Sequence, residues 1–462
     1  MNSLSIFGTS SDAGKSTLSF AITYLLHHRG IKVAPFKAQN VSNNSLVTDI
    51  NAGEIAIAQA FAAEAIGLKT TPYMNPILLK SGAGTKAHLI LNGKSIGEKD
   101  IWNYFKNIKT LRPHVSAAFK MLQKEYDVIV AEGAGSPVEL NLMKKDLSNI
   151  YIAKKFHTKI VIVADIERGG VFASIYGLYN LLPKKLRKNV VGVIINKFRG
   201  DIKLFDKGRE IIEKRFGIKV LGVIPYKAFN LGFEDSQSLM NYTQNTNKAK
   251  ITIGVIALPH ISNFTDFEPL IADREIALRF ITSPNEAMQC DALIIPGSKR
   301  VVDDMLWLQE RGFQKIIANK KRVLIGICGG YEMLFESIYD PHAIESKHQK
   351  VQGFGRFKGS VVFQKKKIVK KGSYNIWGIV ADGYEIHNAR AVKNAKHKKN
   401  LYGTFMHGIF ENDALRLTLF SQLHSDYRGY NFKEYKAKAI HDFAQHVDKH
   451  LNMEYLQNVL ST

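Results

Sequence analysis

The sequence predicts two α/β domains, the first with a parallel β-sheet covered by helices on both faces. A glycine-rich stretch, Gly8–Thr17, lies between a short apolar run and an amphipathic segment, which is the order strand, loop, helix. Across residues 1–235, apolar runs rich in β-branched residues alternate with helical patterns, as is typical of a parallel sheet. A second alternating series begins at Ile251, after an aperiodic polar stretch over residues 241–250.

Six apolar runs of the first domain have the length and composition of buried strands. They are Leu4–Phe7, Val33–Pro35, Asp127–Ala131, Ile160–Ala164, Val190–Ile195 and Val220–Ile224. Several of them end in polar residues, as in Glu132–Ser136 and Asn196–Asp201. Because ligands of open α/β sheets bind beyond the carboxyl ends of the strands, we expect the functional site of this domain there.

The second series contains three further runs of this kind. They are Ile251–Ala257, Asp291–Pro296 and Arg322–Ile327. A β-rich stretch follows over residues 351–410, and an amphipathic helix is predicted over Lys436–Leu451. These patterns divide the chain into a first domain (1–240), a linker (241–250), a second domain (251–445) and a C-terminal tail (446–462).

Composition indicates an ordinary soluble protein of a reducing compartment. The chain has 462 residues, of which 45% are hydrophobic and 23% charged, which suits two or three domains with sizeable cores. Its two cysteines, Cys290 and Cys328, form no disulfide framework and favour the cytoplasm. The N-terminus lacks the pattern of a signal peptide, and no apolar run is long enough to span a membrane, so no membrane partner is expected.

The net charge of 64 − 41 = +23 raises the question of an acidic partner. The densest lysine clusters, over residues 365–371 and 396–399, lack interleaved aromatic side chains. We therefore favour a solvated surface over a nucleic-acid interface. A small polyanionic substrate also suits this charge.

Gly8–Thr17 has the composition of a phosphate-binding loop in a variant form, since five residues rather than four separate Gly8 from Gly14. The backbone N–H groups of such a loop and the following helix N-terminus point at an anion, and Lys15 adds positive charge. Asp12, within the loop, either orients a metal-bound water or shapes the loop itself. The residues predicted to bind the nucleotide, ATP, are Gly8, Thr9, Asp12, Gly14, Lys15, Ser16, Thr17 and Asn196.

The predicted nucleotide site calls for Mg²⁺ and for a group that neutralises phosphate charge. Ser16 follows the loop lysine, which is the usual position of a magnesium-binding hydroxyl. Glu132, at a strand end, is a predicted second ligand, and the alternative is a solvated turn carboxylate. Lys37 is either a group that neutralises the transferred phosphoryl or a surface lysine. Asn196 either reads an adenine edge or caps a turn.

The second domain contains the pattern Gly-x-Cys-x-Gly around Cys328, between an apolar strand and a helix. This is the arrangement of a nucleophile elbow, with cysteine in place of serine. The flanking glycines permit the tight turn, and the helix N-terminus is expected to lower the thiol pKa.

A cysteine nucleophile needs a base, and two histidines are candidates. His407 is followed by glycine and comes after a short apolar run, while His387 ends the stretch Gly383–His387. The residues alone do not separate them. The backbone N–H groups near Gly297 and at Gly329 are predicted to form an oxyanion hole, and the alternative near Gly297 is a plain turn.

Taken together, these stretches resemble the cobyric acid synthase family of glutamine-dependent amidotransferases in cobalamin biosynthesis. The similarity extends over nearly the whole chain. The matching stretches are Gly8–Thr17, Pro35–Ser45, Met74–Lys80, Glu132–Pro137, Asn196–Asp201, Leu258–Phe267, Pro296–Lys299, Cys328–Tyr331, Gly383–His387 and His407–Phe410. Pro35–Ser45 and Ile261–Phe267 are long, and neither follows from nucleotide binding in general.

The resemblance implies a P-loop domain related to dethiobiotin synthetase, followed by a class I glutamine amidotransferase domain. It favours His407 over His387 as the partner of Cys328. In the wider amidotransferase class a glutamate stands two residues after this histidine, where this chain has Ile409. We therefore expect a Cys–His dyad whose ring orientation comes from elsewhere in the chain.

The resemblance also assigns roles near the phosphate loop. Lys37, Gln39 and Asn40 are expected at the substrate and the transferred phosphoryl group. Asp49 is expected as a further metal ligand beside Ser16 and Glu132, although residues 49–54 are looser than the family pattern.

The implied reaction uses ATP, Mg²⁺ and glutamine to amidate the b, d, e and g carboxylates of adenosylcobyrinic acid a,c-diamide. Ammonia released at Cys328 would displace phosphate from an acyl phosphate. The expected partners are the corrinoid and glutamine, without nucleic acid, and a homo-oligomer is left open. Three alternatives remain: a cobyrinic acid a,c-diamide synthase, a ParA-like DNA-partition ATPase, and a non-catalytic scaffold.

Overall fold

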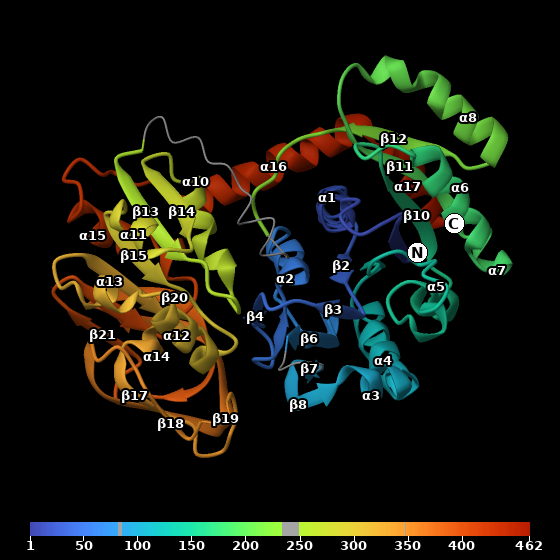
Figure 1. Cartoon of the computed structure of the whole chain (residues 1–462). Helices are drawn as coiled ribbons and strands as arrows, with labels where there is room; N and C mark the ends of the chain where they lie inside the picture. The colour runs from blue at the N-terminus through green and yellow to red at the C-terminus, as the bar shows by residue number, and fades with distance from the viewer. Residues whose placement is uncertain (82–85, 233–248, 347) are drawn as a thin grey trace. The chain divides into compact units, whose positions relative to one another are not determined.

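The structure, a computed structural model, describes residues 1–81, 86–232, 249–346 and 348–462, which form two compact units (Figure 1). The first unit consists of Met1–Ser42, Thr48–Asn230 and Ala437–Thr462. The second unit consists of Asn43–Val47 and Leu231–Lys436. Residues 241–248 of the predicted linker lie outside the described residues.

A six-stranded sheet with the order β12-β11-β10-β1-β9-β2 forms the core of the first unit. Its strands are β1 (Leu4–Gly8), β2 (Val33–Phe36), β9 (Val128–Glu132), β10 (Lys159–Asp165), β11 (Val190–Phe198) and β12 (Val220–Pro225). Each corresponds to one predicted run, and every neighbouring pair is parallel. The prediction of a parallel sheet is confirmed.

Helices connect these strands and bury apolar side chains against the sheet. They are α1 (Lys15–His28), α2 (Ile57–Glu64), α4 (Arg112–Gln123), α5 (Ile150–Phe156), α6 (Val171–Leu181), α7 (Lys184–Arg187) and α8 (Asp206–Phe216), with the short helix η4 (Ile202–Phe205). Phe119 of α4 meets Phe36 of β2 edge to face, with 5.1 Å between ring centroids. Ile175 of α6 and Ile212 of α8 belong to a second buried cluster, with residues of β10 and β11.

A smaller sheet of the first unit, with the order β3-β6-β7-β8, is not among the predicted elements. Its strands are β3 (Gln39–Val41), β6 (Ile77–Ser81), β7 (Lys86–Leu91) and β8 (Lys94–Asp100). β8 is polar and largely exposed, so it lacks the apolar run that marks a buried strand. The remaining short elements of this unit are β5 (Glu54–Ala56), η1 (Pro72–Met74), α3 (Ile101–Lys106), η2 (Ile108–Leu111) and η3 (Met143–Lys145).

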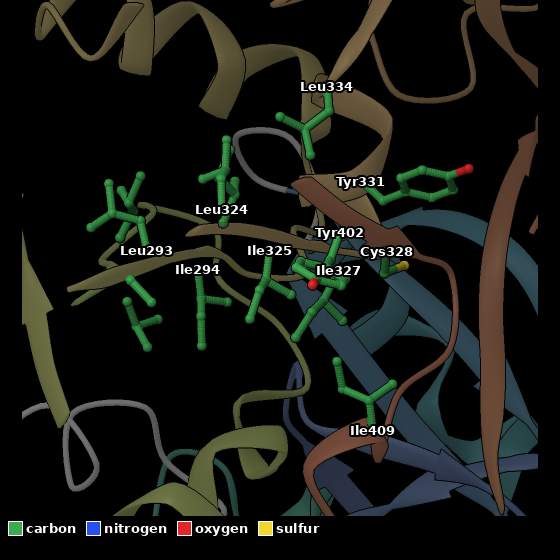
Figure 2. Close-up of a cluster of buried hydrophobic side chains, with 14 of the residues drawn as sticks. Leu293, Ile294, Leu324, Ile325, Ile327, Cys328, Tyr331, Leu334, Tyr402 and Ile409 are labelled. Carbon is green, nitrogen blue, oxygen red and sulfur yellow. The ribbon is translucent and has the colours of Figure 1, made fainter. Parts of the chain in front are cut away.

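The main sheet of the second unit has the order β14-β13-β15-β16-β22-β21 and is parallel except for β21. Its strands are β13 (Ile251–Ile256), β14 (Ile276–Ile281), β15 (Ala292–Ile295), β16 (Val323–Ile327), β21 (Ala395–Lys398) and β22 (Leu401–Thr404). In Figure 2, Leu293 and Leu324 project to one face of this sheet and Ile294 and Ile325 to the other, with Cys328 at the carboxyl end of β16. The helices of this unit are η5 (Phe264–Phe267), α10 (Glu268–Ala272), α11 (Pro284–Met288), α12 (Val301–Glu310), α13 (Gln314–Ala318), α14 (Gly329–Met333), η6 (Ile409–Glu411) and α15 (Asp413–Ser421).

The predicted β-rich stretch forms most of a second sheet of this unit, with the order β18-β17-β19-β20. Its strands are β17 (Phe335–Tyr339), β18 (Lys350–Gln352), β19 (Phe357–Ile376) and β20 (Ile379–Arg390). β19 and β20 form a long antiparallel hairpin, and β4 (Ser45–Val47) contacts both strands.

The C-terminal part of the chain belongs to a different unit from the one predicted. The predicted helix is present as α16 (Phe432–His450), followed by α17 (Met453–Ser461). Residues from 437 onwards, however, belong to the first unit, so the predicted second domain is too long. The reason is direct bonding: Asp448 pairs with Arg29 at 2.6 Å, and His446 Nε2 lies 2.9 Å from the carbonyl oxygen of Pro225. Within the described ranges, no helix combines the length and apolarity that crossing a membrane requires.

Candidate active sites

The phosphate loop joins β1 to α1, and its two glycines shape it. A Cβ at Gly8 would lie 2.7 Å from Nζ of Lys15, so a side chain there would displace the lysine. Gly14 adopts φ +92°, and a Cβ there would collide with Nδ2 of Asn196. Asn196 donates from Nδ2 to the carbonyl of Ala13 at 2.9 Å. The structure thus assigns Asn196 to holding the loop, which favours the capping alternative.

The other loop residues are held by backbone partners. Lys15 is buried and donates to the carbonyl of Ser10 at 2.8 Å, within the loop. The N–H of Thr9 donates to Val163 on β10, and Thr17 Oγ1 donates to the Gly14 carbonyl. Asp12 adopts φ +56°, a backbone conformation that aspartate tolerates.

Glu132, at the end of β9, lies at the centre of a buried polar cluster. Its Oε1 accepts hydrogen bonds from Ser16 Oγ at 2.6 Å and from Lys37 Nζ at 2.8 Å. Its Oε2 accepts one from Gln59 Nε2 at 3.1 Å. Because Glu132 and Lys37 are only 3% and 5% exposed, they are neither a solvated turn carboxylate nor a surface lysine. The structure brings together the predicted metal ligands Ser16 and Glu132 with the predicted phosphoryl-neutralising group Lys37.

Three further predicted residues form hydrogen bonds within the first unit. Gln39 Oε1 accepts a hydrogen bond from Tyr104 at 2.7 Å, and Asn40 Oδ1 accepts one from the N–H of Val41 at 2.8 Å. Asp49 is exposed, and its Oδ2 accepts hydrogen bonds from both the N–H and Oγ1 of Thr70. This gives Asp49 a turn-stabilising role, and its metal role stays a prediction.

Cys328 forms a nucleophile elbow between β16 and α14. Its backbone has φ +49° and ψ −110°, a strained conformation for a residue with a Cβ. A Cβ at Gly330 would collide with the Ile295 carbonyl, and one at Gly326 would lie 2.8 Å from the Gly330 carbonyl. The flanking glycines are therefore required by close backbone approach. The N–H of Cys328 donates to Thr404 at the end of β22, at 2.8 Å.

His407 is oriented by a buried carboxylate, Asp266. His407 Nδ1 lies 2.7 Å from Asp266 Oδ2, and the N–H of Gly408 donates to Asp266 Oδ1 at 2.7 Å. Both side chains are almost fully buried. A carboxylate that accepts from Nδ1–H leaves the Nε2 lone pair free to take a proton. Asp266 therefore supplies the ring orientation that was expected from elsewhere in the chain, in place of the glutamate that Ile409 replaces, and the pairing of His407 with Cys328 stays a prediction.

The sheet topology explains how distant residues meet at this site. Cys328 follows β16, His407 follows β22, Gly297 follows β15, and Asp266 lies in the connection after β13. These four strands are parallel neighbours, so their carboxyl ends share one edge of the sheet.

The predicted oxyanion groups lie against each other and against His407. A Cβ at Gly297 would lie 3.1 Å from Cε1 of His407, and one at Gly329 would lie 2.8 Å from the backbone nitrogen of Ser298. Asp304, fully buried, accepts a hydrogen bond from Ser298 Oγ at 2.6 Å and lies 2.7 Å from His260 Nδ1. These bonds fix the turn that carries Gly297.

Burial raises the pKa of the Cys328 thiol well above its ordinary value, and the carboxylates of Glu332 and Glu345 raise it further. The N–H of Gly329 acts in the opposite direction but does not prevail. The expectation that the helix N-terminus lowers this pKa is therefore wrong. Helix α14 has only five residues, and the desolvation of a buried thiolate outweighs it. Burial thus favours the neutral thiol, whose Sγ lies 3.8 Å from the carbonyl oxygen of Ile386.

Two families of known proteins match the two domains of the chain. A family described as the CobQ/CobB/MinD/ParA nucleotide binding domain matches residues 4–233, and the CobB/CobQ-like glutamine amidotransferase domain matches residues 252–415. The chain is 50% identical to a cobyric acid synthase of Acinetobacter baylyi over 99% of its own length and 98% of the relative's. The chain belongs to the cobyric acid synthase family.

Other members of the family are similar over comparable lengths. The cobyric acid synthase of Listeria monocytogenes serotype 4a is 38% identical over 98% of this chain and 96% of its own length. That of Clostridium perfringens strain SM101 is 36% identical over 99% of both chains. Like other cobyric acid synthases, the chain is an ATP-using, glutamine-dependent amidotransferase of cobalamin biosynthesis.

His387, the competing histidine, has surroundings different from those of His407. Its Nδ1 lies 2.8 Å from the carbonyl of Ala389, and its ring stacks on Phe405 with 4.0 Å between centroids. Its Nε2 has no hydrogen-bond partner and lies 3.7 Å from Glu385. The histidine that is bonded to a carboxylate and lies against Gly297 is His407.

Sequence reasoning missed Asp266 and Asp304 as members of the amidotransferase site. Asp266 lies within Leu258–Phe267, which served only as a mark of the cobyric acid synthase family. A carboxylate in a family-specific loop that follows a parallel strand is the signal that would have found it.

Proposed function

We propose that the protein amidates the b, d, e and g carboxylates of adenosylcobyrinic acid a,c-diamide to give adenosylcobyric acid, with ATP, Mg²⁺ and glutamine. The observation that carries this proposal is the presence, in one chain, of a phosphate loop, a nucleophile elbow at Cys328 and a buried His407–Asp266 pair. The names of the relatives support the corrinoid and the product. The net charge of +23 suits a polycarboxylate substrate.

In the proposed glutaminase half-reaction, Cys328 attacks the side-chain amide carbon of glutamine while its thiol proton passes to Nε2 of His407. Asp266 holds the ring so that Nε2 faces this proton. The N–H of Gly329 and the backbone at Gly297–Ser298 stabilise the oxyanion. His407 then protonates the leaving nitrogen, the C–N bond breaks, and ammonia departs. Water hydrolyses the thioester to glutamate and restores the thiol.

In the proposed synthetase half-reaction, a substrate carboxylate oxygen attacks the γ-phosphorus of ATP, giving an acyl phosphate and ADP. Ammonia attacks the acyl carbon, phosphate leaves, and an amide remains. Lys15 and the N–H groups of the loop bind the phosphates, and Lys37 neutralises charge on the transferred group. Gln39 and Asn40 are proposed at the substrate.

Ser16 and Glu132 fit a Mg²⁺ ion, because a hydroxyl and a carboxylate 2.6 Å apart offer the oxygen donors that this cation takes. When bound, the ion would neutralise negative charge on the β- and γ-phosphates. Asp49 remains a third proposed ligand. The cytoplasmic location and a homo-oligomeric state also stay predictions.

The test compares two variants with two nitrogen sources, using mass gain of cobyrinic acid a,c-diamide as the readout. Lys15→Ala should abolish amidation with either glutamine or ammonia. Cys328→Ala should abolish only the glutamine-dependent reaction and keep the ammonia-dependent one. Four added amides support the proposed product, whereas cobyrinic acid as the accepted substrate with only two amidations would indicate an a,c-diamide synthase. A Cys328→Ala enzyme that still used glutamine at the normal rate would refute the triad.

A further inference from the structure

A short segment of the chain, Asn43–Val47, leaves the first unit and returns to it. Ser42 and Thr48 on either side belong to the first unit, while Asn43–Val47 belongs to the compact second unit, where β4 contacts β20. Asn44 and Ser45 are both fully buried. The same stretch of sequence, Pro35–Ser45, contains Lys37, which bonds to Glu132 at the phosphate loop.

Two hydrogen bonds connect this segment to the loop that holds Asp266. Thr265 Oγ1 donates to Asn44 Oδ1 at 3.2 Å, and Asn263 Nδ2 donates to the carbonyl of Ser45 at 2.6 Å. Thr265 directly precedes Asp266. Asn263 adopts φ +52°, so the backbone of this loop is constrained where the segment contacts it.

Both connections lead to the imidazole of His407. The first passes from Asn44 through Thr265 to Asp266, whose Oδ2 lies 2.7 Å from His407 Nδ1. The second uses the side chain of Asn263, which also donates to the hydroxyl of Tyr384 at 3.0 Å. The Tyr384 ring stacks on His407, with 5.3 Å between centroids and 23° between planes.

From these contacts we infer that Asn43–Val47 is a positioning segment of the glutaminase site, and that it makes glutamine hydrolysis depend on ligands of the phosphate-loop unit. The inference rests on the proposed function. Asn44 and Thr265 hold Asp266 in place, and Asp266 in turn holds the ring of His407. The segment is covalently continuous with Lys37–Asn40. Binding of ligands at the phosphate site therefore shifts the position of Asn43–Val47. Ammonia release is thereby tied to ATP and the corrinoid.

The test uses the full-length enzyme and measures glutamine hydrolysis with and without Mg-ATP and cobyrinic acid a,c-diamide. Thr265→Val removes the hydroxyl at nearly constant volume, and Asn44→Ala removes its acceptor. Each should lower the ligand-stimulated kcat by about 10-fold, with little change in KM for glutamine, because a misplaced catalytic group affects the chemical step. The double variant should lose no more than either single variant, because both remove one shared bond.

Controls separate positioning from structural damage. Thr265→Ser keeps the hydroxyl and should restore both kcat and its stimulation. Thr282→Val, at an exposed position directly after β14, should leave both unchanged. Ammonia-dependent amidation should remain at the wild-type level in every variant. Wild-type stimulation in the Asn44→Ala or Thr265→Val enzyme, additive losses in the double variant, or no stimulation of the wild-type enzyme would overturn the inference. Absence of corrinoid mass gain with ammonia in the wild-type enzyme would instead refute the proposed function.

Discussion

The phosphate loop and the nucleophile elbow are both strand–turn–helix connections at the carboxyl end of a parallel strand, yet they use left-handed backbone in opposite ways. In the phosphate loop the residue before the helix, Gly14, has φ +92° and no side chain. In the elbow the residue before the helix, Cys328, has φ +49° and keeps its side chain. A loop that binds an anion through backbone N–H groups must have no side chain between these groups and the anion. A loop that presents a nucleophile retains one and moves the glycines to its flanks.

The two sites also differ in the sign of the charged side chains around them. Near the phosphate loop, the buried cations Lys15 and Lys37 accompany Glu132. Around the elbow, burial and then the carboxylates of Glu332 and Glu345 raise the pKa of the Cys328 thiol. The first site suits a polyanion, while the second favours the protonated form of the Cys328 thiol.

The largest expected effect comes from Gly14→Ala, which tests whether the phosphate loop requires a residue without a side chain at position 14. Left-handed backbone with a Cβ costs on the order of 1–3 kcal/mol, and the Cβ would also collide with Nδ2 of Asn196. We expect ATP binding by calorimetry to be lost, and ammonia- and glutamine-dependent amidation to be lost with it. Gly30→Ala is the matched control, because it has φ +81° with open space around its Cα, and it should affect stability alone. Normal ATP binding by the Gly14→Ala enzyme would contradict this.

The next effect is confined to the elbow and comes from Asp266→Asn. The amide group would donate to Nδ1 of His407, which forces the ring proton onto Nε2 and blocks transfer from the thiol. By the behaviour of hydrolytic triads, we expect kcat for glutamine hydrolysis to fall by about 10²–10⁴-fold. Ammonia-dependent amidation should remain unchanged. Wild-type glutaminase kinetics in this variant would show that His407 is oriented by another group.

The contrast between the two sites also explains which parts were predictable from sequence. The phosphate loop and the elbow are contiguous patterns, so roles for Lys15, Ser16 and Cys328 can be predicted from neighbouring residues alone. Asp266 stands 141 residues before His407, and only the shared edge of the parallel sheet brings them together. The direction of the Cys328 pKa was missed because burial, which dominates it, has no local signature in the sequence. The polar strand β8 was missed for the converse reason, since its residues stay exposed.

The smallest expected effect concerns the carboxylates beside the thiol and comes from Glu345→Gln. Burial raises the pKa of Glu345 to about 7, so this group is largely neutral below pH 7 and negatively charged above it. Its charge raises the pKa of Cys328, so the variant should have a lower thiol pKa and more thiolate at a given alkaline pH. We expect alkylation by iodoacetamide to be faster by about 2–5-fold at pH 8, with little difference at pH 6.

The measurement is made in a Cys290→Ala background, so that Cys328 is the only thiol that reacts. The accompanying change Lys299→Gln offers a reciprocal check, because Lys299 lowers the pKa of Glu345 and its removal should keep that carboxyl neutral to higher pH. When Glu345→Gln is compared with Glu345 in the Lys299→Gln background, the acceleration of alkylation should begin at a higher pH. An equal acceleration at pH 6 and pH 8 would mean that the charge of Glu345 does not act on the thiol. The raised pKa of Cys328 would then come from burial without a contribution from this carboxylate.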